Sequence, residues 1–164
     1  MKDELGLEYT SSHAESAVLF NQALTRYLAS DATTMSQLED VLFADPEMPM
    51  AMMFRAYLLK LAADPRFKVR IDQCLDTLVQ RTDLNEREIL HREALTLWRD
   101  NQLEETAHAF DNIICQYPRD MLAIRVAHYL HFYEQGGNAM IGTDALAYDL
   151  RSRGGEVIIH LSCK

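Results

Sequence analysis

Glycine and proline are scarce in this chain, with six glycines and four prolines among 164 residues. Because these two residues interrupt helices most strongly, their scarcity favours long helical segments. Cysteine is also sparse: Cys74, Cys115 and Cys163 are an odd number at wide spacing, with no CxxC pair. This pattern argues against a disulfide framework and a zinc ribbon, and it predicts buried thiols in a reducing compartment.

Long apolar runs are missing as well. No segment approaches eighteen uninterrupted apolar residues, and the N-terminal sequence MKDELGLEYTSSHAES has no apolar core of signal-peptide length. The composition is otherwise that of one globular domain, with 48% hydrophobic and 25% charged residues. We therefore expect a cytoplasmic protein with no membrane association.

Basic residues are outnumbered, with 16 Lys and Arg against 25 Asp and Glu and a formal net charge of -9. A negative surface repels the phosphate backbone of nucleic acids and anionic lipids. Neither nucleic acid nor a membrane surface is therefore an expected partner. A protein or peptide is expected instead, and a basic one fits best.

Apolar residues recur at the helical spacing i, i+3, i+4, i+7 almost throughout the chain. The pattern and its start and stop signals predict seven helices joined by short turns, so that sequential neighbours are antiparallel. The expected helices are His13–Ala29, a second from Thr33-Thr34 to Asp45-Pro46, a third from Pro49, a fourth after Asp64-Pro65, a fifth from Asn85 to Arg99, a sixth at Leu103–Gln116, and a seventh from Asp120 to Gly136-Gly137.

Two local signals in the second half of the chain are specific. Asn85 followed by Glu88 resembles a capping box, in which each residue satisfies a backbone N–H of the other. Asn101 stands where the fifth helix must turn back into the sixth, and asparagine tolerates the left-handed backbone conformation that such a turn requires.

An internal repeat decides the expected architecture. The spacing Leu38-x2-Val41-x4-Pro46-x4-Ala51 recurs at Phe110-x2-Ile113-x4-Pro118-x4-Ala123, displaced by 110 - 38 = 72 residues. This displacement equals two units of about 36 residues, and a unit of that length corresponds to a helix pair that stacks on its neighbours to bury a shared core. The chain is thus predicted to be all-α, an α-solenoid of antiparallel helix pairs with about seven helices. The alternative is a non-repeating helical bundle.

The unit that begins at Arg87 is similar to a tetratricopeptide repeat. The matching apolar, small and closing positions are Leu90, Ala94, Leu97, Leu103, Thr106, Phe110 and Pro118. The unit departs from the pattern at Glu93, where an apolar residue is usual, and at Ile113, where alanine is usual. The resemblance implies a helical-repeat scaffold.

The second half of the chain carries a residue pattern that is more specific than the generic tetratricopeptide pattern. It comprises Arg87-Glu88-x2-His91, Ala94, Asn101, Pro118-x-Asp120-Met121-Leu122-Ala123, Ala127-His128 and Phe132-Tyr133. These residues resemble the tetratricopeptide repeat protein 38 family, over about residues 13–135. The resemblance implies a fold and a scaffold-like function, with no reaction.

The resemblance ends after Gly137. We expect residues 1–12 to form a flexible N-terminus, residues 13–135 the repeat domain, and residues 136–164 a divergent tail that is poorly ordered or irregular. Members of the resembled family are longer, so the chain is expected to be an N-terminal portion of a longer repeat protein. A genuine capping element is the alternative interpretation of the tail.

The resemblance also implies a binding groove, because the first helix of each pair lines a concave surface in this repeat class. The residues it places there are Met50, Met53, Tyr57, Lys60, Glu88, His91, Leu95, Trp98, Leu122, Arg125, Tyr129 and Phe132. Aromatic, methionine and arginine anchors suit the capture of a peptide or protein segment. The alternative is that the apolar members belong to the core, as Leu95 and Leu122 would, and that the run from Met48 to Met53 serves as adaptable packing.

Catalytic chemistry has weak support. His128 and His131 are three residues apart on one expected helix and His91 lies a repeat earlier, so a metal-binding or hydrolytic site is an alternative function. No HExxH motif accompanies them, and the default role is a structural histidine. We expect no catalytic residues, no metal and no cofactor. A further alternative is a homo-oligomer formed through an exposed end of the solenoid.

Overall fold

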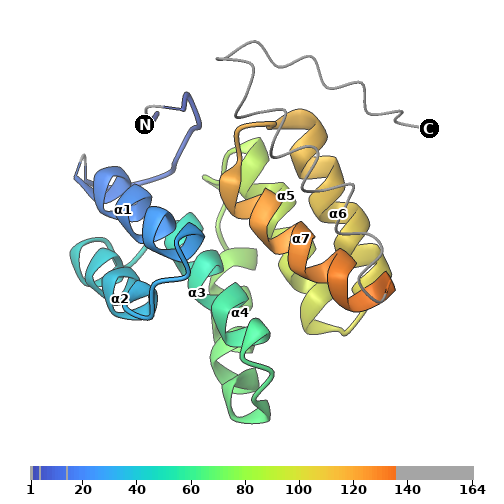
Figure 1. Ribbon diagram of the computed structural model, residues 1–164. Helices are drawn as coiled ribbons and strands as arrows, with labels where there is room; N and C mark the ends of the chain where they lie inside the picture. The colour runs from blue at the N-terminus through green and yellow to red at the C-terminus, as the bar shows by residue number, and fades with distance from the viewer. Residues whose placement is uncertain (1, 4, 14, 136–164) are drawn as a thin grey trace.

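The computed structural model describes residues 2–3, 5–13 and 15–135. Over these residues the fold is all-α, as predicted (Figure 1). Its elements are α1 (Ser16–Leu28), α2 (Thr34–Ala44), α3 (Pro49–Leu61), the 3-10 helix η1 (Pro65–Phe67), α4 (Lys68–Val79), α5 (Glu86–Arg99), α6 (Leu103–Gln116) and α7 (Met121–Gln135). The expected tail, residues 136–164, lies outside the described residues, as does the end of the array proposed for self-association.

The helices pack in the order of the sequence. α1 packs on α2, α3 on α4, α5 on α6, and α7 on α6, while α3 joins the first two helices to α5. This sequential packing agrees with the predicted helical-repeat architecture. One contact departs from simple stacking, because α7 also reaches α1. In Figure 1, α3 accordingly lies between the α1–α2 pair and the group formed by α5, α6 and α7.

The local start and stop signals act as predicted. The Asn85 side chain accepts from the Glu88 amide at 3.0 Å, and the Glu88 carboxylate accepts from the Asn85 amide at 3.1 Å, which completes the capping box of α5. Asn101 has φ 58° in the turn between α5 and α6, so its left-handed conformation is confirmed. Asp64 caps η1 by accepting from the Arg66 amide at 2.9 Å.

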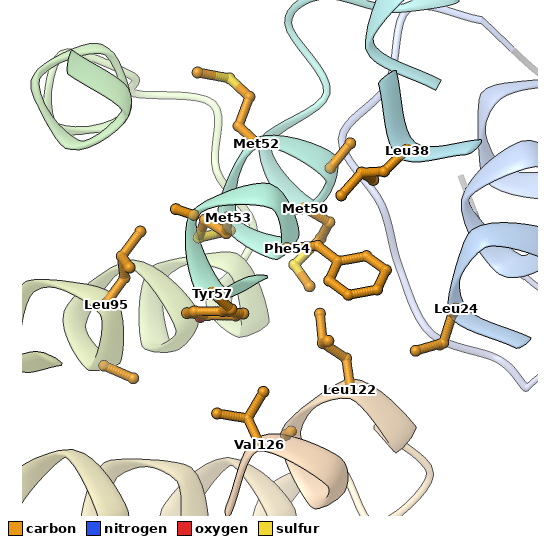
Figure 2. Close-up of a cluster of buried hydrophobic side chains, with 14 of the residues drawn as sticks. Leu24, Leu38, Met50, Met52, Met53, Phe54, Tyr57, Leu95, Leu122 and Val126 are labelled. Atoms are coloured by element: carbon orange, nitrogen blue, oxygen red, sulfur yellow. The ribbon is translucent and has the colours of Figure 1, made fainter. Parts of the chain in front are cut away.

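The core is centred on α3, whose first residues, Pro49–Phe54, are all apolar and all buried. Figure 2 shows core side chains gathering around this helix. The buried residues labelled there include Leu24 of α1, Leu38 of α2, Met50, Met53, Phe54 and Tyr57 of α3, Leu95 of α5, and Leu122 and Val126 of α7. Faces of α1, α3, α5 and α7 are therefore buried against one another.

The N-terminal segment corrects the expectation that residues 1–12 are flexible. Tyr9 is only 2% exposed and Leu7 is also buried. Asp3 accepts from the Leu7 amide at 2.8 Å, and Thr10 donates its amide and its hydroxyl to the Glu88 carboxylate at 2.8 and 2.7 Å. Side-chain contacts to distant helices therefore hold a segment that has no helical periodicity of its own.

No helix in the described part of the chain is both long and apolar enough to cross a membrane.

Candidate binding site

Eight of the twelve residues predicted to line the groove lie inside the protein. They are Met50, Met53, Tyr57, Glu88, His91, Leu95, Trp98 and Leu122. The expectation that they line an open groove is therefore wrong in this structure, where the rings of Tyr57 and Trp98, for example, pack on each other and on Phe110 of α6. The alternative assignment of Leu95 and Leu122 to the core is confirmed.

A buried polar network explains why two of these residues, Tyr57 and His91, are polar. The Asp120 carboxylate accepts from Arg87 Nη1 at 2.7 Å, lies 2.9 Å from His91 Nε2, and accepts from the Ala123 amide at 3.0 Å. The Tyr57 hydroxyl lies 3.0 Å from His91 Nδ1 and 2.9 Å from the His91 carbonyl oxygen. The network ties α3, α5 and the start of α7 together.

The charges within the network favour one ionisation state. Burial alone would raise the pKa of the Asp120 carboxyl, but His91, Arg87 and the Ala123 amide outweigh burial and hold that pKa well below its usual range. Burial and the Asp120 charge raise the pKa of the Tyr57 phenol. The network thus holds an ionised carboxylate and a neutral phenol, and its members have partners inside the fold.

The residues of the predicted groove that are not buried are Lys60 on α3, whose Nζ donates to Asn101 Oδ1 at 3.1 Å, and three residues of α7. Arg125, Tyr129 and Phe132 are four and three residues apart, which places them along one face of the helix. We call these three residues the α7 strip. The Arg125 guanidinium carbon lies 5.0 Å from the centre of the Tyr129 ring, and Phe132 is 40% exposed. The strip thus presents a cation and two aromatic rings.

The strip borders the end of α1. Arg125 Nη2 donates to Ser30 Oγ and to the Tyr129 hydroxyl, both at 3.3 Å. Ser30 has φ 57° directly after α1, and the Tyr27 ring packs on Phe54 with ring centres 5.2 Å apart. We call Tyr27, Ser30, Arg125 and Tyr129 the α1–α7 seam.

The α1–α7 seam contains two buried polar atoms, the Tyr27 hydroxyl oxygen and Arg125 Nε, that have no hydrogen-bond partner within the described ranges. Burial and the neighbouring Tyr129 raise the pKa of the Tyr27 phenol. Arg125 lowers this pKa, but by less than the other two effects raise it. The phenol is therefore neutral and carries a proton. Both atoms are hydrogen-bond donors.

The histidines considered for a metal site do not converge. His91 is engaged by Tyr57 and Asp120, whereas His131 Nε2 lies 2.9 Å from Oδ1 of a different carboxylate, that of Asp111 on α6. Within the described ranges, no group of three or more His, Cys, Asp or Glu side chains is placed to hold a metal ion. His128 also lies on α7, outside the His91 network.

The cysteines divide between the core and the surface. Cys74 is buried, its thiol donates to the Met52 carbonyl at 3.5 Å, and burial raises its pKa to about 11. Cys115 is exposed on α6, which corrects the expectation of a buried thiol, because it lies off the buried face of that helix. Cys163 lies outside the described residues.

Sequence reasoning missed the residues that the fold brings to these places. The sequence places Asp120 directly before the helix that follows Pro118. The Asp120 carboxylate indeed caps α7 by accepting from the Ala123 amide. Its pairing with Arg87 and His91 had no local signal. Tyr27 and Ser30 were missed because their partners lie about a hundred residues away, as the 95-residue separation of Ser30 and Arg125 shows.

No protein-family model matches this chain, and no solved structure was found to match it.

Proposed function

We propose that this protein is a non-enzymatic interaction scaffold that binds a peptide or protein segment across the α7 strip. The observation that carries the proposal is the arrangement of Arg125, Tyr129 and Phe132 on one accessible helix face. Arginine and tyrosine are enriched among the residues that dominate binding energy at interfaces. Because Ser30 and Tyr129 already hold the Arg125 side chain, less conformational entropy is lost on binding.

Three further expectations support this reading and remain part of the proposal. The sequence resembles the tetratricopeptide repeat protein 38 family and, through it, helical-repeat scaffolds. The net charge of -9 disfavours nucleic acid and anionic membranes and favours a partner with overall positive charge. The buried Cys74 thiol suits a reducing compartment, for which we propose the cytoplasm.

The test is selection of peptides from a random library displayed on phage, followed by affinity measurement on matched variants. Phe132→Ala removes the most exposed ring of the α7 strip. Phe43→Ala is the control, because Phe43 is 92% exposed on α2 and removing its ring changes the same chemistry at a distant surface. Far-UV circular dichroism and thermal melting establish that both variants remain folded.

We expect selected peptides to bind wild type and Phe43→Ala equally and Phe132→Ala about thirtyfold more weakly, as for an interface residue worth about 2 kcal/mol. Peptides that lose affinity for Phe43→Ala but not for Phe132→Ala would place the binding surface on α2 instead. A library that yields no binder to the folded wild-type chain would contradict the scaffold proposal itself.

A further inference from the structure

The α1–α7 seam has two donors that nothing among the described residues satisfies. The Tyr27 hydroxyl and Arg125 Nε are both buried and have no hydrogen-bond partner in that part of the chain, while Tyr27 as a whole is only 8% exposed. A buried donor without an acceptor costs free energy, and two in one seam indicate a missing acceptor. The missing group must accept hydrogen bonds, because the Tyr27 hydroxyl and Arg125 Nε–H are both donors.

The charge of the seam indicates which acceptor fits. Among the described residues, no carboxylate oxygen lies within the 4.0 Å ion-pair distance of the Arg125 guanidinium, although Arg87 and Arg99 each have such a partner. The contacts that Arg125 makes are with neutral oxygens, those of Ser30 and Tyr129. An anionic acceptor would therefore complete the seam.

The size of the charge distinguishes a carboxylate from a phosphate. The seam offers one guanidinium, and the hydroxyls of Tyr27 and Tyr129 lie beside it. A guanidinium presents a planar fork that matches the two oxygens of a carboxylate. A phosphate monoester carries a charge of about -2 and is poorly compensated by a single cation in a protein of net charge -9.

We infer that the α1–α7 seam is a carboxylate-binding site, which anchors the bound peptide through its C-terminal carboxylate or an acidic side chain. The inference rests on the proposed function and names the chemistry of the ligand at that surface. Arg125 would supply the charge and the fork, and the Tyr27 hydroxyl would donate a further hydrogen bond. The aromatic residues Tyr129 and Phe132 would contact the neighbouring part of the peptide.

The test follows the Nε–Hε signal of Arg125 in the 15N NMR spectrum of the full chain. Sodium acetate is the probe for the carboxylate alone, and sodium chloride at equal ionic strength controls for screening. Three further probes locate the carboxylate that binds. N-acetylphenylalanine has a terminal carboxylate, N-acetylphenylalanine amide has none, and N-acetylglutamate α-amide has a side-chain carboxylate. Inorganic phosphate tests the competing anion.

We expect acetate to shift the Arg125 signal saturably where chloride does not, and both acids to bind while N-acetylphenylalanine amide does not. Arg125→Lys keeps the charge but loses the fork, and should weaken acetate binding at least tenfold. Arg70→Lys is the matched control, because Arg70 is exposed on α4, and this change should leave acetate affinity unaltered.

Tyr27→Phe separates a binding role from a structural one. Because the hydroxyl has no partner among the residues that the structure describes, its removal should leave thermal stability unchanged or raise it, while acetate affinity falls severalfold. A lower melting temperature with unchanged acetate affinity would overturn the inference, as would a phosphate affinity above that of acetate or a shift that chloride reproduces.

The two proposals fail separately. Peptides that require Phe132 but bind equally well with and without a carboxylate would remove the carboxylate site and leave the scaffold function standing. Saturable acetate binding at Arg125, without any peptide binder in the library, would keep the site and remove the scaffold function.

Discussion

His91 and Asp120 are separated by 29 residues, yet His91 Nε2 lies 2.9 Å from Asp120 Oδ2 inside the protein. The same carboxylate accepts from Arg87, which also donates to the Glu8 carbonyl oxygen at 2.9 Å. One acidic side chain thus connects α5 with the start of α7, and through Arg87 with the N-terminal segment. Arg87, His91 and Asp120 make these connections. All three belong to the residue pattern that resembles the tetratricopeptide repeat protein 38 family.

Asp120→Asn is expected to lower the free energy of unfolding by about 3–5 kcal/mol, because it leaves the buried Arg87 without a counter-charge. Urea denaturation measures the loss. The control is Asp111→Asn, which removes the acidic partner of His131 on a side chain that is 44% exposed. It should cost at most about 1 kcal/mol. Equal losses for the two variants would mean that the buried network does not stabilise the fold.

The same carboxylate predicts how stability depends on pH. The pKa of Asp120 is lower in the folded than in the unfolded chain, where an aspartate titrates near about 3.9. Its stabilisation is therefore complete above that pH and is lost as the pH falls toward the folded pKa. Unfolding free energies at pH about 5 and about 3 should differ more for wild type than for Asp120→Asn.

Comparison with the same variant isolates this carboxylate from the others. Neighbouring donors also lower the pKa values of Asp31, Asp64 and Asp83, but both proteins contain these residues, so their effect cancels in the difference. A wild type and a variant that lose the same stability on acidification would contradict the assignment of an ionised carboxylate to Asp120.

Local chemistry made the helices predictable. The capping box at Asn85, the left-handed Asn101 and the proline at the start of α3 each act within a few residues, and the structure shows all three. The displaced repeat at Leu38 and Phe110 depends only on spacing. Sequence therefore sufficed for the all-α class and the sequential packing of the helices.

The candidate site depended on information that local patterns lack. Helical periodicity identifies the apolar face of α3 and of α5, but it does not indicate whether another helix covers that face. Tyr57 and Trp98 suit a binding groove and a core equally well, and the structure places both in the core, where their rings pack on each other and on Phe110 of α6. Thr10 likewise bonds to Glu88, 78 residues away, without any local signal.

The turn after α3 predicts a stabilising substitution. Ala63 has φ 52°, a left-handed conformation that costs a residue with a Cβ atom about 1–2 kcal/mol. Ala63→Gly relieves that strain at an entropic cost of about 0.5–1 kcal/mol, so the unfolding free energy should rise by about 0.5–1 kcal/mol. Denaturant titration of both proteins measures the change.

The preceding residue is the matched control for this turn. Ala62 has φ -67°, which suits any residue, so Ala62→Gly adds only entropy to the unfolded chain and should lower stability by about 0.5–1 kcal/mol. The two substitutions should thus have opposite signs. A loss of stability in both would contradict the left-handed conformation of Ala63.

The packed N-terminal segment makes the last prediction. Tyr9 is buried with its ring centre 5.1 Å from that of Phe20, and the Arg87 guanidinium carbon lies 4.7 Å above its ring. Tyr9→Ala should therefore cost about 3–5 kcal/mol, as for other buried aromatic residues. It should also speed amide hydrogen exchange at Thr10, whose N–H donates to Glu88 at 2.8 Å.

Lys2→Ala is the control within the same segment, because the Lys2–Glu8 ion pair is exposed and its removal should change stability by at most about 1 kcal/mol. If Tyr9→Ala cost no more than Lys2→Ala and left exchange at Thr10 unaltered, the segment would be a flexible extension. A large loss in Tyr9→Ala alone would instead make residues 2–12 part of the domain, because the hydrogen bonds that Arg87 and Glu88 form with Glu8 and Thr10 then contribute to its stability.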